Sequence, residues 1–189
     1  MPAYFAMVKH NVIVHRRLGP WTEALQLPNG RELVLRPIVA LDSEPLRASF
    51  STLSPEEIRL RFMHPITELT PEYARQLTQL IPNREFALVA TEPVPAGEAL
   101  IGAVARLSID PDARTAEFAL VVGRPLSGMG LGSYMLRKLI QYARRRKLKS
   151  IHGDVLAENA PMLRLCERLG FSHRTLAGEH GIIRVWQDL

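Results

Sequence analysis

The sequence predicts a mixed α/β (α+β) fold, with a central sheet of about six to seven strands flanked by helices. Strand-like and helical segments follow one another along the chain, which is typical of a sheet covered by helices. The segment Leu131–Lys147 carries a single apolar stripe, and a glycine-rich turn joins it to the apolar strand before it. The composition, 47% hydrophobic and 23% charged over 189 residues, is that of a globular protein.

The first half of the chain predicts one strand followed by three short helices. Leu33 and Leu35 lie on one face of Glu32–Arg36, as in a half-buried strand. Helices are expected to begin near three positions with helix-start signals: Asp42, Ser54 and Thr70. Three apolar residues are expected on one face of the third helix: Ala74, Leu77 and Ile81.

The second half predicts strands on both sides of a long helix. The expected strands are Glu85–Thr91, Ala99–Ser108, Thr115–Val122 and Ser150–Val155, with a C-terminal hairpin of Ser172–Leu176 and Ile182–Trp186. The long helix presents its stripe to the sheet: Met135, Leu136, Leu139, Ile140 and Ala143. A further helix is expected between Asn159 as its N-cap and Gly170 as its stop.

Composition also bounds the organisation and location of the protein. We expect one domain over residues 31–189, preceded by an arm over residues 1–30 whose structure the pattern leaves open. The chain has one cysteine and lacks an apolar run of membrane-spanning length, so we expect a cytoplasmic protein without a membrane partner, monomeric or homodimeric. The net charge of +5 suits an anionic ligand, although the basic run Arg144–Lys147 is better explained as a solvated helix end, which disfavours a nucleic-acid partner.

The strongest functional signal is the glycine-rich turn between Thr115–Val122 and the long helix. Gly128, Gly130 and Gly132 allow backbone amides to approach a ligand, and the helix that follows offers unpaired amides and a partial positive charge. This arrangement is typical of a diphosphate site, although a purely structural turn is the alternative. A Rossmann site is disfavoured because the unit lies late in the chain, after hairpins.

These motifs resemble those of the GNAT acetyltransferase superfamily, in its order: Val121-Val122, the loop from Ser127 to Gly132, and Asn159 before Leu169-Gly170-Phe171. The resemblance implies acetyl-CoA as cosubstrate, no metal, and a binding site formed by Leu120, Val121, Val122, Ser127, Gly128, Met129, Gly130, Leu131, Gly132, Ser133 and Asn159. Ser127 stands where the family usually has Gln or Arg. Asn159 is a contact for the pantetheine, a helix N-cap, or both.

A finer resemblance is to the catalytic domains of bacterial Pat-type protein lysine acetyltransferases. The matching segments are Leu53–Glu56 with Leu60-Arg61-Phe62, Ala116-Glu117-Phe118-Ala119 and Gly153–Asn159. It implies a protein lysine as acceptor, on a target of the acyl-CoA synthetase type, and Glu117 as general base. Relatives often carry a fused synthetase-like or cyclic-nucleotide module, and we expect neither within these 189 residues.

The residue pattern around Glu117 is consistent with that role. Glu117 shares a strand face with Ala119 and Val121, so we expect apolar surroundings that raise the pKa of its carboxyl towards the range of a useful base. A carboxylate paired with a basic neighbour is the structural alternative. Glu85 is the second candidate base.

The residue pattern does not identify a side chain that protonates the leaving thiolate. Many relatives place a tyrosine where this chain has Cys166, and Cys166 lies on an apolar stripe, which favours a buried structural cysteine over an acid or a nucleophile. Water is then expected to protonate the leaving thiolate. The histidines show no metal-ligand spacing.

Other functions remain open from the sequence alone. A small amine or an aminoacyl-tRNA is an alternative acceptor for the same machinery. A non-catalytic acetyl-CoA sensor is a further alternative, and the presence of Glu117 argues against it.

Overall fold

The computed structural model describes residues 12–63, 66–112, 114–176, 178 and 181–189. Its strands form one sheet in the order β1-β2-β3-β4-β5-β6-β7-β9-β8. The bounds are β1 Ile13–Gly19, β2 Thr22–Gln26, β3 Glu32–Pro37, β4 Glu85–Thr91, β5 Ile101–Ile109, β6 Thr115–Val122, β7 Ser150–Leu156, β8 Ser172–Thr175 and β9 Ile182–Asp188. Neighbouring strands are antiparallel except β6 and β7, which are parallel.

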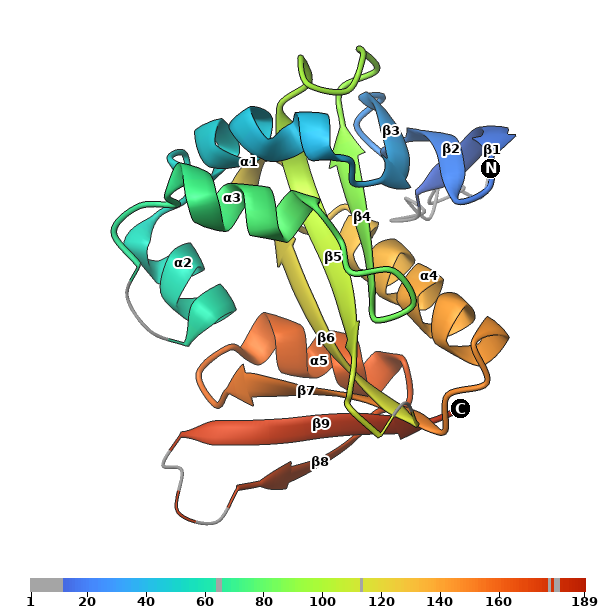
Figure 1. The fold of residues 1–189 in the computed structure, drawn as a ribbon. Coiled ribbons are helices and arrows are strands. Elements are labelled where there is room, and N and C mark those ends of the chain that lie inside the picture. The colour runs from blue at the N-terminus through green and yellow to red at the C-terminus, as the bar shows by residue number, and fades with distance from the viewer. Residues whose placement is uncertain (1–11, 64–65, 113, 177, 179–180) are drawn as a thin grey trace, which may run out of the picture.

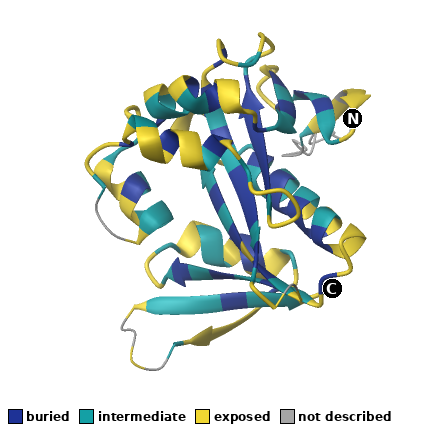
Figure 2. Ribbon diagram, viewed as in Figure 1, coloured by how far each residue is buried: buried dark blue, intermediate teal, exposed yellow. Residues whose placement is uncertain are grey.

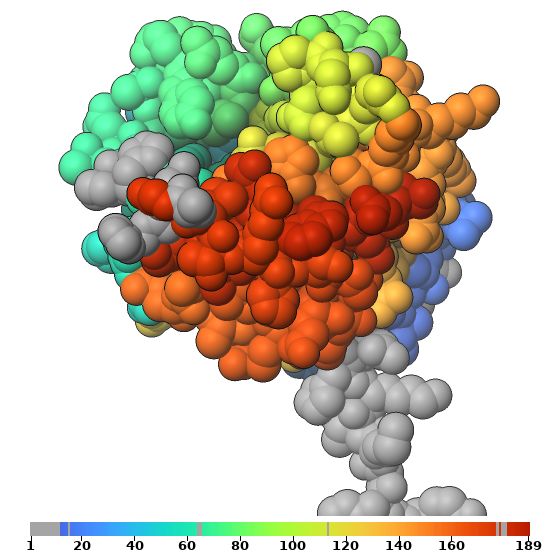
Figure 3. All heavy atoms as spheres, turned by 90° about the horizontal axis from the view of Figure 1, so that it is seen from below, coloured from blue at the N-terminus to red at the C-terminus, as the bar shows by residue number. Residues whose placement is uncertain are grey.

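Helices cover both faces of the sheet. The helices are α1 Ser43–Phe50, α2 Pro55–Phe62, α3 Pro71–Thr78, α4 Leu131–Arg145 and α5 Ala160–Arg168, with 3-10 turns at Ala40–Asp42 and Arg124–Leu126. In Figure 1, α1 and α3 lie in front of β4–β6, with α2 beside them, whereas α4 lies behind these strands. The C-terminal elements α5 and β7–β9 form the lower surface, in orange and red in Figure 3. No helix in the described ranges is long and apolar enough to cross a bilayer.

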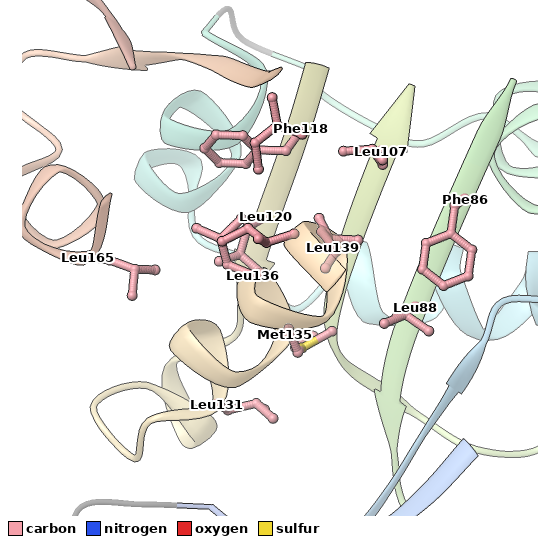
Figure 4. Packing of buried hydrophobic residues seen from close by; sticks show 14 of the residues in the cluster. Phe86, Leu88, Leu107, Phe118, Leu120, Leu131, Met135, Leu136, Leu139 and Leu165 are labelled. Atoms are coloured by element: carbon pink, nitrogen blue, oxygen red, sulfur yellow. The ribbon is translucent and has the colours of Figure 1, made fainter. Parts of the chain in front are cut away.

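The largest core lies between the sheet and helices α4 and α5. Figure 4 shows the stripe of α4, including Met135, Leu136 and Leu139, packed against side chains from β4, β5 and β6. All five residues of the stripe expected from the sequence are buried. The strands β4–β6 run through the most buried part of the molecule (Figure 2), so burial of this apolar surface holds β6 and the start of α4 together.

Local start signals placed the helices correctly. The Ser54 hydroxyl accepts a hydrogen bond from the Glu57 amide at 3.2 Å, and the Glu57 carboxylate accepts one from the Ser54 amide at 2.8 Å, which completes a capping box. The Thr70 hydroxyl caps α3 in the same way. The expected apolar face of α3 was wrong at Ile81, because α3 ends at Thr78 and Ile81 is exposed.

The expected strand count of six to seven was too low, because the described residues form nine strands. The two additional strands, β1 and β2, come from the arm that the sequence pattern left open, and β2 pairs with β3. Long-range contacts hold this hairpin: Trp21 packs edge-on against Phe86, and the Glu23 carboxylate pairs with Lys138 of α4 at 2.7 Å. The apolar residues of β1 do not alternate with its polar ones, so the sequence gives no signal from which this strand could be inferred.

Strands β6 and β7 pair along only part of their length. Three residue pairs join them, from Thr115–Ser150 to Glu117–His152, and β6 then continues to Val122 without β7 beside it. The Phe118 ring fills the space where the strands separate, in edge contact with Phe171. Gly153 faces this ring so closely that an added Cβ would lie 2.8 Å from Phe118 Cε1. The absence of a side chain at Gly153 therefore leaves room for the Phe118 ring where β6 and β7 separate.

Candidate active site

A groove of about 1150 Å³ lies where β6 and β7 separate. One wall comes from α2 and the other from α5, and an exposed ion pair between Arg59 of α2 and Glu158, which precedes α5, links the two. Most of the residues expected at an acetyl-CoA site line it: Leu120, Val121, Val122, Ser127, Gly128, Gly130, Gly132, Ser133 and Asn159. The groove thus brings together three segments that are up to 39 residues apart in the sequence, from Leu120 to Asn159.

The floor of the groove is the free edge of β6. From Phe118 to Val122 this strand pairs only with β5. In an antiparallel pair every second residue directs its N–H and C=O away from the partner strand. Backbone groups of β6 therefore face the groove and are available to a ligand, since β7 does not pair with them.

The glycine loop leads from this edge to the N-terminus of α4. Gly128 and Gly130 have φ values of 75° and 84°, in the left-handed region that glycine adopts readily. Gly130 is the N-cap of α4, and the first amides of the helix have no acceptor within it. Backbone donors and the positive end of the helix dipole thus meet at one end of the groove, which fits a diphosphate.

Two residues of the loop contribute differently from the glycines. The Leu131 side chain is buried in the core at 1% exposure, and Met129 packs partly against the same core. Neither lines the groove, so any contact they make with a ligand would be through the backbone. The Ser127 hydroxyl lies within 3.3 Å of the Val122 and Gly123 carbonyl oxygens and donates to this part of the backbone, which stabilises the turn.

Asn159 is the N-cap of α5, which confirms the expectation of a capping role. Its side-chain oxygen accepts a hydrogen bond from the Met162 amide at 3.2 Å. The residue also lines the groove, so capping does not remove it from the site.

Sequence reasoning missed four arginines that line the groove: Arg124, Arg137, Arg164 and Arg168. All four are exposed. Arg124 also lies within 4 Å of the carboxylates of Glu56 and Glu57. Together these arginines supply positive charge to a groove that fits a polyphosphate ligand. Their spacing carries no motif, because they come from a 3-10 turn and from the outward faces of α4 and α5.

Glu117 is exposed, which corrects the expectation of apolar surroundings. It alternates along β6 with the buried Ala116 and Phe118, so it lies on the face of β6 turned away from the core that contains α4. In register across the sheet, its neighbours are Ser108 of β5 and His152 of β7. The residue stands at the last pair before β6 and β7 diverge, at the end of the open edge of β6 opposite the glycine loop.

A histidine and an aspartate that sequence reasoning did not select lie near Glu117. His152 Nε2 lies 2.9 Å from Asp110 Oδ2, and the Thr115 hydroxyl also donates to Asp110. Burial opposes the charge on Asp110, but these two hydrogen bonds outweigh it and lower the pKa of this carboxyl. The buried His152 Nδ1 has no hydrogen-bond partner among the described residues.

The second candidate base, Glu85, is engaged in structural contacts. Its carboxylate accepts hydrogen bonds from Arg106 Nη1 at 3.0 Å and from the Ile81 amide at 2.8 Å. These contacts tie β4 to β5 and to the end of the α3 segment. Glu117, which has neither contact, is the better placed of the two carboxylates.

Neither Cys166 nor Tyr134, the tyrosine that lines the groove, is placed to donate a proton to the leaving thiolate. Cys166 is 1% exposed, and burial raises the pKa of its thiol to about 12, as expected for a structural cysteine. Tyr134 lines the groove, but its hydroxyl donates to the buried Glu23, and burial and that carboxylate raise the pKa of the phenol. Among the described residues, no three His, Cys, Asp or Glu side chains gather in a way that could hold a metal ion.

Comparison with known proteins identifies the family. The family model described as "Acetyltransferase (GNAT) domain" matches residues 32–172. This chain belongs to the GNAT acetyltransferases. It is 30% identical to acetyltransferase PA5475 of Pseudomonas aeruginosa over 151 residues, which cover 80% of each protein.

Solved structures share the fold of this chain. The GNAT domain of S. lividans PAT superposes with a TM-score of 0.79 at 24% identity, covering 92% of this chain and all of that one. Spermidine N-acetyltransferase from Vibrio cholerae, in complex with CoA and spermine, has a TM-score of 0.64 at 18% identity and covers 82% of this chain and 95% of its own. As a member of the GNAT family, the protein is an acetyl-CoA-dependent N-acetyltransferase.

Proposed function

We propose that this GNAT enzyme transfers the acetyl group to a primary amine, with a protein lysine ε-amine as the leading acceptor and Glu117 as general base. The observation that carries the proposal is the path of β6: its edge is unpaired from Val122, next to the glycine loop that fits a diphosphate, back to Phe118, and Glu117 is the next residue. One strand thus presents a binding surface and a carboxylate at opposite ends of the same edge.

The reaction requires a base because of the acceptor. A lysine ε-ammonium has a pKa of about 10.4, so it is protonated near neutral pH and cannot attack a thioester until it loses a proton. Glu117 is exposed and can reach an incoming ammonium. When bound, acetyl-CoA supplies the activated acyl group, and the backbone amides of the β6 edge can stabilise negative charge on the carbonyl oxygen.

The proposed acceptor class rests on the sequence resemblance and not on the fold. The fold is shared with the PAT domain and with a spermidine acetyltransferase, so fold alone does not separate protein from polyamine substrates. The finer sequence resemblance favours a protein lysine, and an acyl-CoA synthetase is the target to test first. Because Cys166 is buried and the Tyr134 hydroxyl donates to Glu23, we propose that water protonates the leaving thiolate. We also propose that the enzyme acts in the cytoplasm.

The test compares wild-type protein with Glu117→Gln, using free thiol to report turnover. Acceptors are an AMP-forming acyl-CoA synthetase, spermidine and an aminoacyl-tRNA. Loss of the base should lower kcat/KM about 10²- to 10⁴-fold, with acetyl-CoA affinity by calorimetry unchanged. Glu98→Gln, which alters an exposed carboxylate between β4 and β5, is the matched control.

Three results would contradict parts of the proposal. Full activity in Glu117→Gln would remove Glu117 as base. Turnover of spermidine but not of the synthetase would replace the acceptor. Tight acetyl-CoA binding without turnover of any acceptor would favour a sensor.

A further inference from the structure

Arg61 differs from every other arginine with a half-buried or buried side chain in the described residues. The four others are each held by a carboxylate: Arg36 by Asp42 at 2.7 Å, Arg47 by Glu44 at 2.8 Å, Arg106 by Glu85 at 3.0 Å, and Arg184 by Asp154 at 2.6 Å. Arg61 makes no ion pair or hydrogen bond with any residue that the structure describes. A partly buried cation without a carboxylate partner is costly, and a ligand that carries an anion would relieve that cost.

The surroundings of Arg61 do not replace that missing anion. Its guanidinium lies 4.7 Å from the centre of the Phe62 ring. Burial, and then the nearby Arg106 cation, lower the pKa of Arg61, and Tyr73 and Glu117 act more weakly in the opposite direction. Arg61 therefore lies within electrostatic range of the proposed base, Glu117.

A second cavity adjoins the groove at this point. It has a volume of about 310 Å³ and lies beneath α1, α2 and α3, and leucine and phenylalanine side chains form much of its wall. Three residues line both spaces: Arg61, Val121 and Leu126. A water-sized group occupies about 30 Å³, so an acetyl methyl would leave most of this cavity empty.

We propose that Arg61 binds a carboxylate on a short aliphatic chain, and that the chain lies in the apolar cavity. The proposal rests on the proposed function, because it places this ligand beside the reacting atoms. The apolar wall suits the chain, and the unpaired guanidinium at the boundary with the groove suits a planar carboxylate. The carboxylate belongs either to the acceptor amine or to the acyl group of the donor, and both would place it next to Val121.

Two pairs of ligands that differ in the carboxylate distinguish the sources. The acceptor pair is 6-aminohexanoate and hexylamine, measured by calorimetry in the presence of CoA. The donor pair is succinyl-CoA and butyryl-CoA, measured by calorimetry alone. Both pairs of ligands are tested with wild type, Arg61→Gln and Arg75→Gln. Arg75→Gln is the control, because it removes an exposed charge of α3 that lines neither the groove nor the apolar cavity.

We expect wild type to bind the carboxylate member of one pair about tenfold to a hundredfold more tightly. Arg61→Gln should abolish that preference and Arg75→Gln should keep it. A preference in the acceptor pair identifies the amine as the source, and one in the donor pair identifies the acyl group.

The proposal is overturned if wild type prefers neither carboxylate, or if the preference survives Arg61→Gln. It is also overturned if Arg61→Gln weakens both members of a pair equally, since Arg61 would then act only on Glu117 or on the fold. These binding measurements need no turnover, so a carboxylate preference without acetyl transfer would reject the proposed function and keep this site.

Discussion

The two ends of β6 are built differently. At its start, Thr115–Glu117 pairs with β5 on one side and β7 on the other, and the Asp110–His152 contact links the same strands. At its end, Phe118–Val122 pairs with β5 alone and borders the groove. The comparison teaches that a strand held firmly at one end can leave its backbone free at the other, where a ligand can use it.

The largest expected effect on stability comes from Phe118, which lies where β6 and β7 separate. Phe118→Ala removes a buried ring that packs against Phe171 and Gly153, and we expect it to lower the free energy of unfolding by about 3–5 kcal/mol. Equilibrium denaturation measures this loss. Val121→Ala, on the opposite face of the open end, serves as comparison and should cost less. An equal loss in the two variants would show that the ring does not support the divergence of the strands.

A substitution at Gly153, which contacts the Phe118 ring, should lower the free energy of unfolding by a smaller amount. Gly153→Ala places a methyl group 2.8 Å from Phe118 Cε1, and we expect a loss of about 1–3 kcal/mol in unfolding free energy. Because the two residues touch, Phe118→Leu should recover part of the loss when combined with Gly153→Ala. Strict additivity in this double-mutant cycle would contradict direct packing between them.

The smallest expected effect concerns the paired end and depends on pH. Burial acts against the ionised Asp110, but hydrogen bonds from Thr115 and His152 lower the pKa of this carboxyl below 3.8 in the folded protein. Its contribution is therefore complete above the unfolded pKa and is lost as the pH falls through the folded value. Asp110→Asn should cost about 1 kcal/mol near pH 7, because the carboxylate is partly exposed.

Stability of this variant and wild type, measured from pH 7 to pH 2.5, should converge at the acid end. A difference that stays constant with pH would show that Asp110 acts through its shape and not its charge.

Much of the fold could be predicted because its signals are local. The caps at Ser54 and Thr70 satisfy amides three residues away, so a few residues suffice to identify them. The stripe of α4 depends only on helical spacing, and all of it is buried as expected. Strands β1 and β2 were missed because their contacts come from Phe86 and from α4, more than 60 residues away.

The candidate site divides in the same way. The sequence by itself determined the glycine loop, the helix that follows it and the strand that carries Glu117, because strand, turn and helix are continuous in the chain. Only the tertiary structure decided that Glu117 is exposed and that Asp110 and His152 lie near it. It also decided that Arg61 makes no ion pair with a carboxylate of the described residues. Burial and ion pairing depend on which distant segments pack together, and residue spacing along one chain does not specify that.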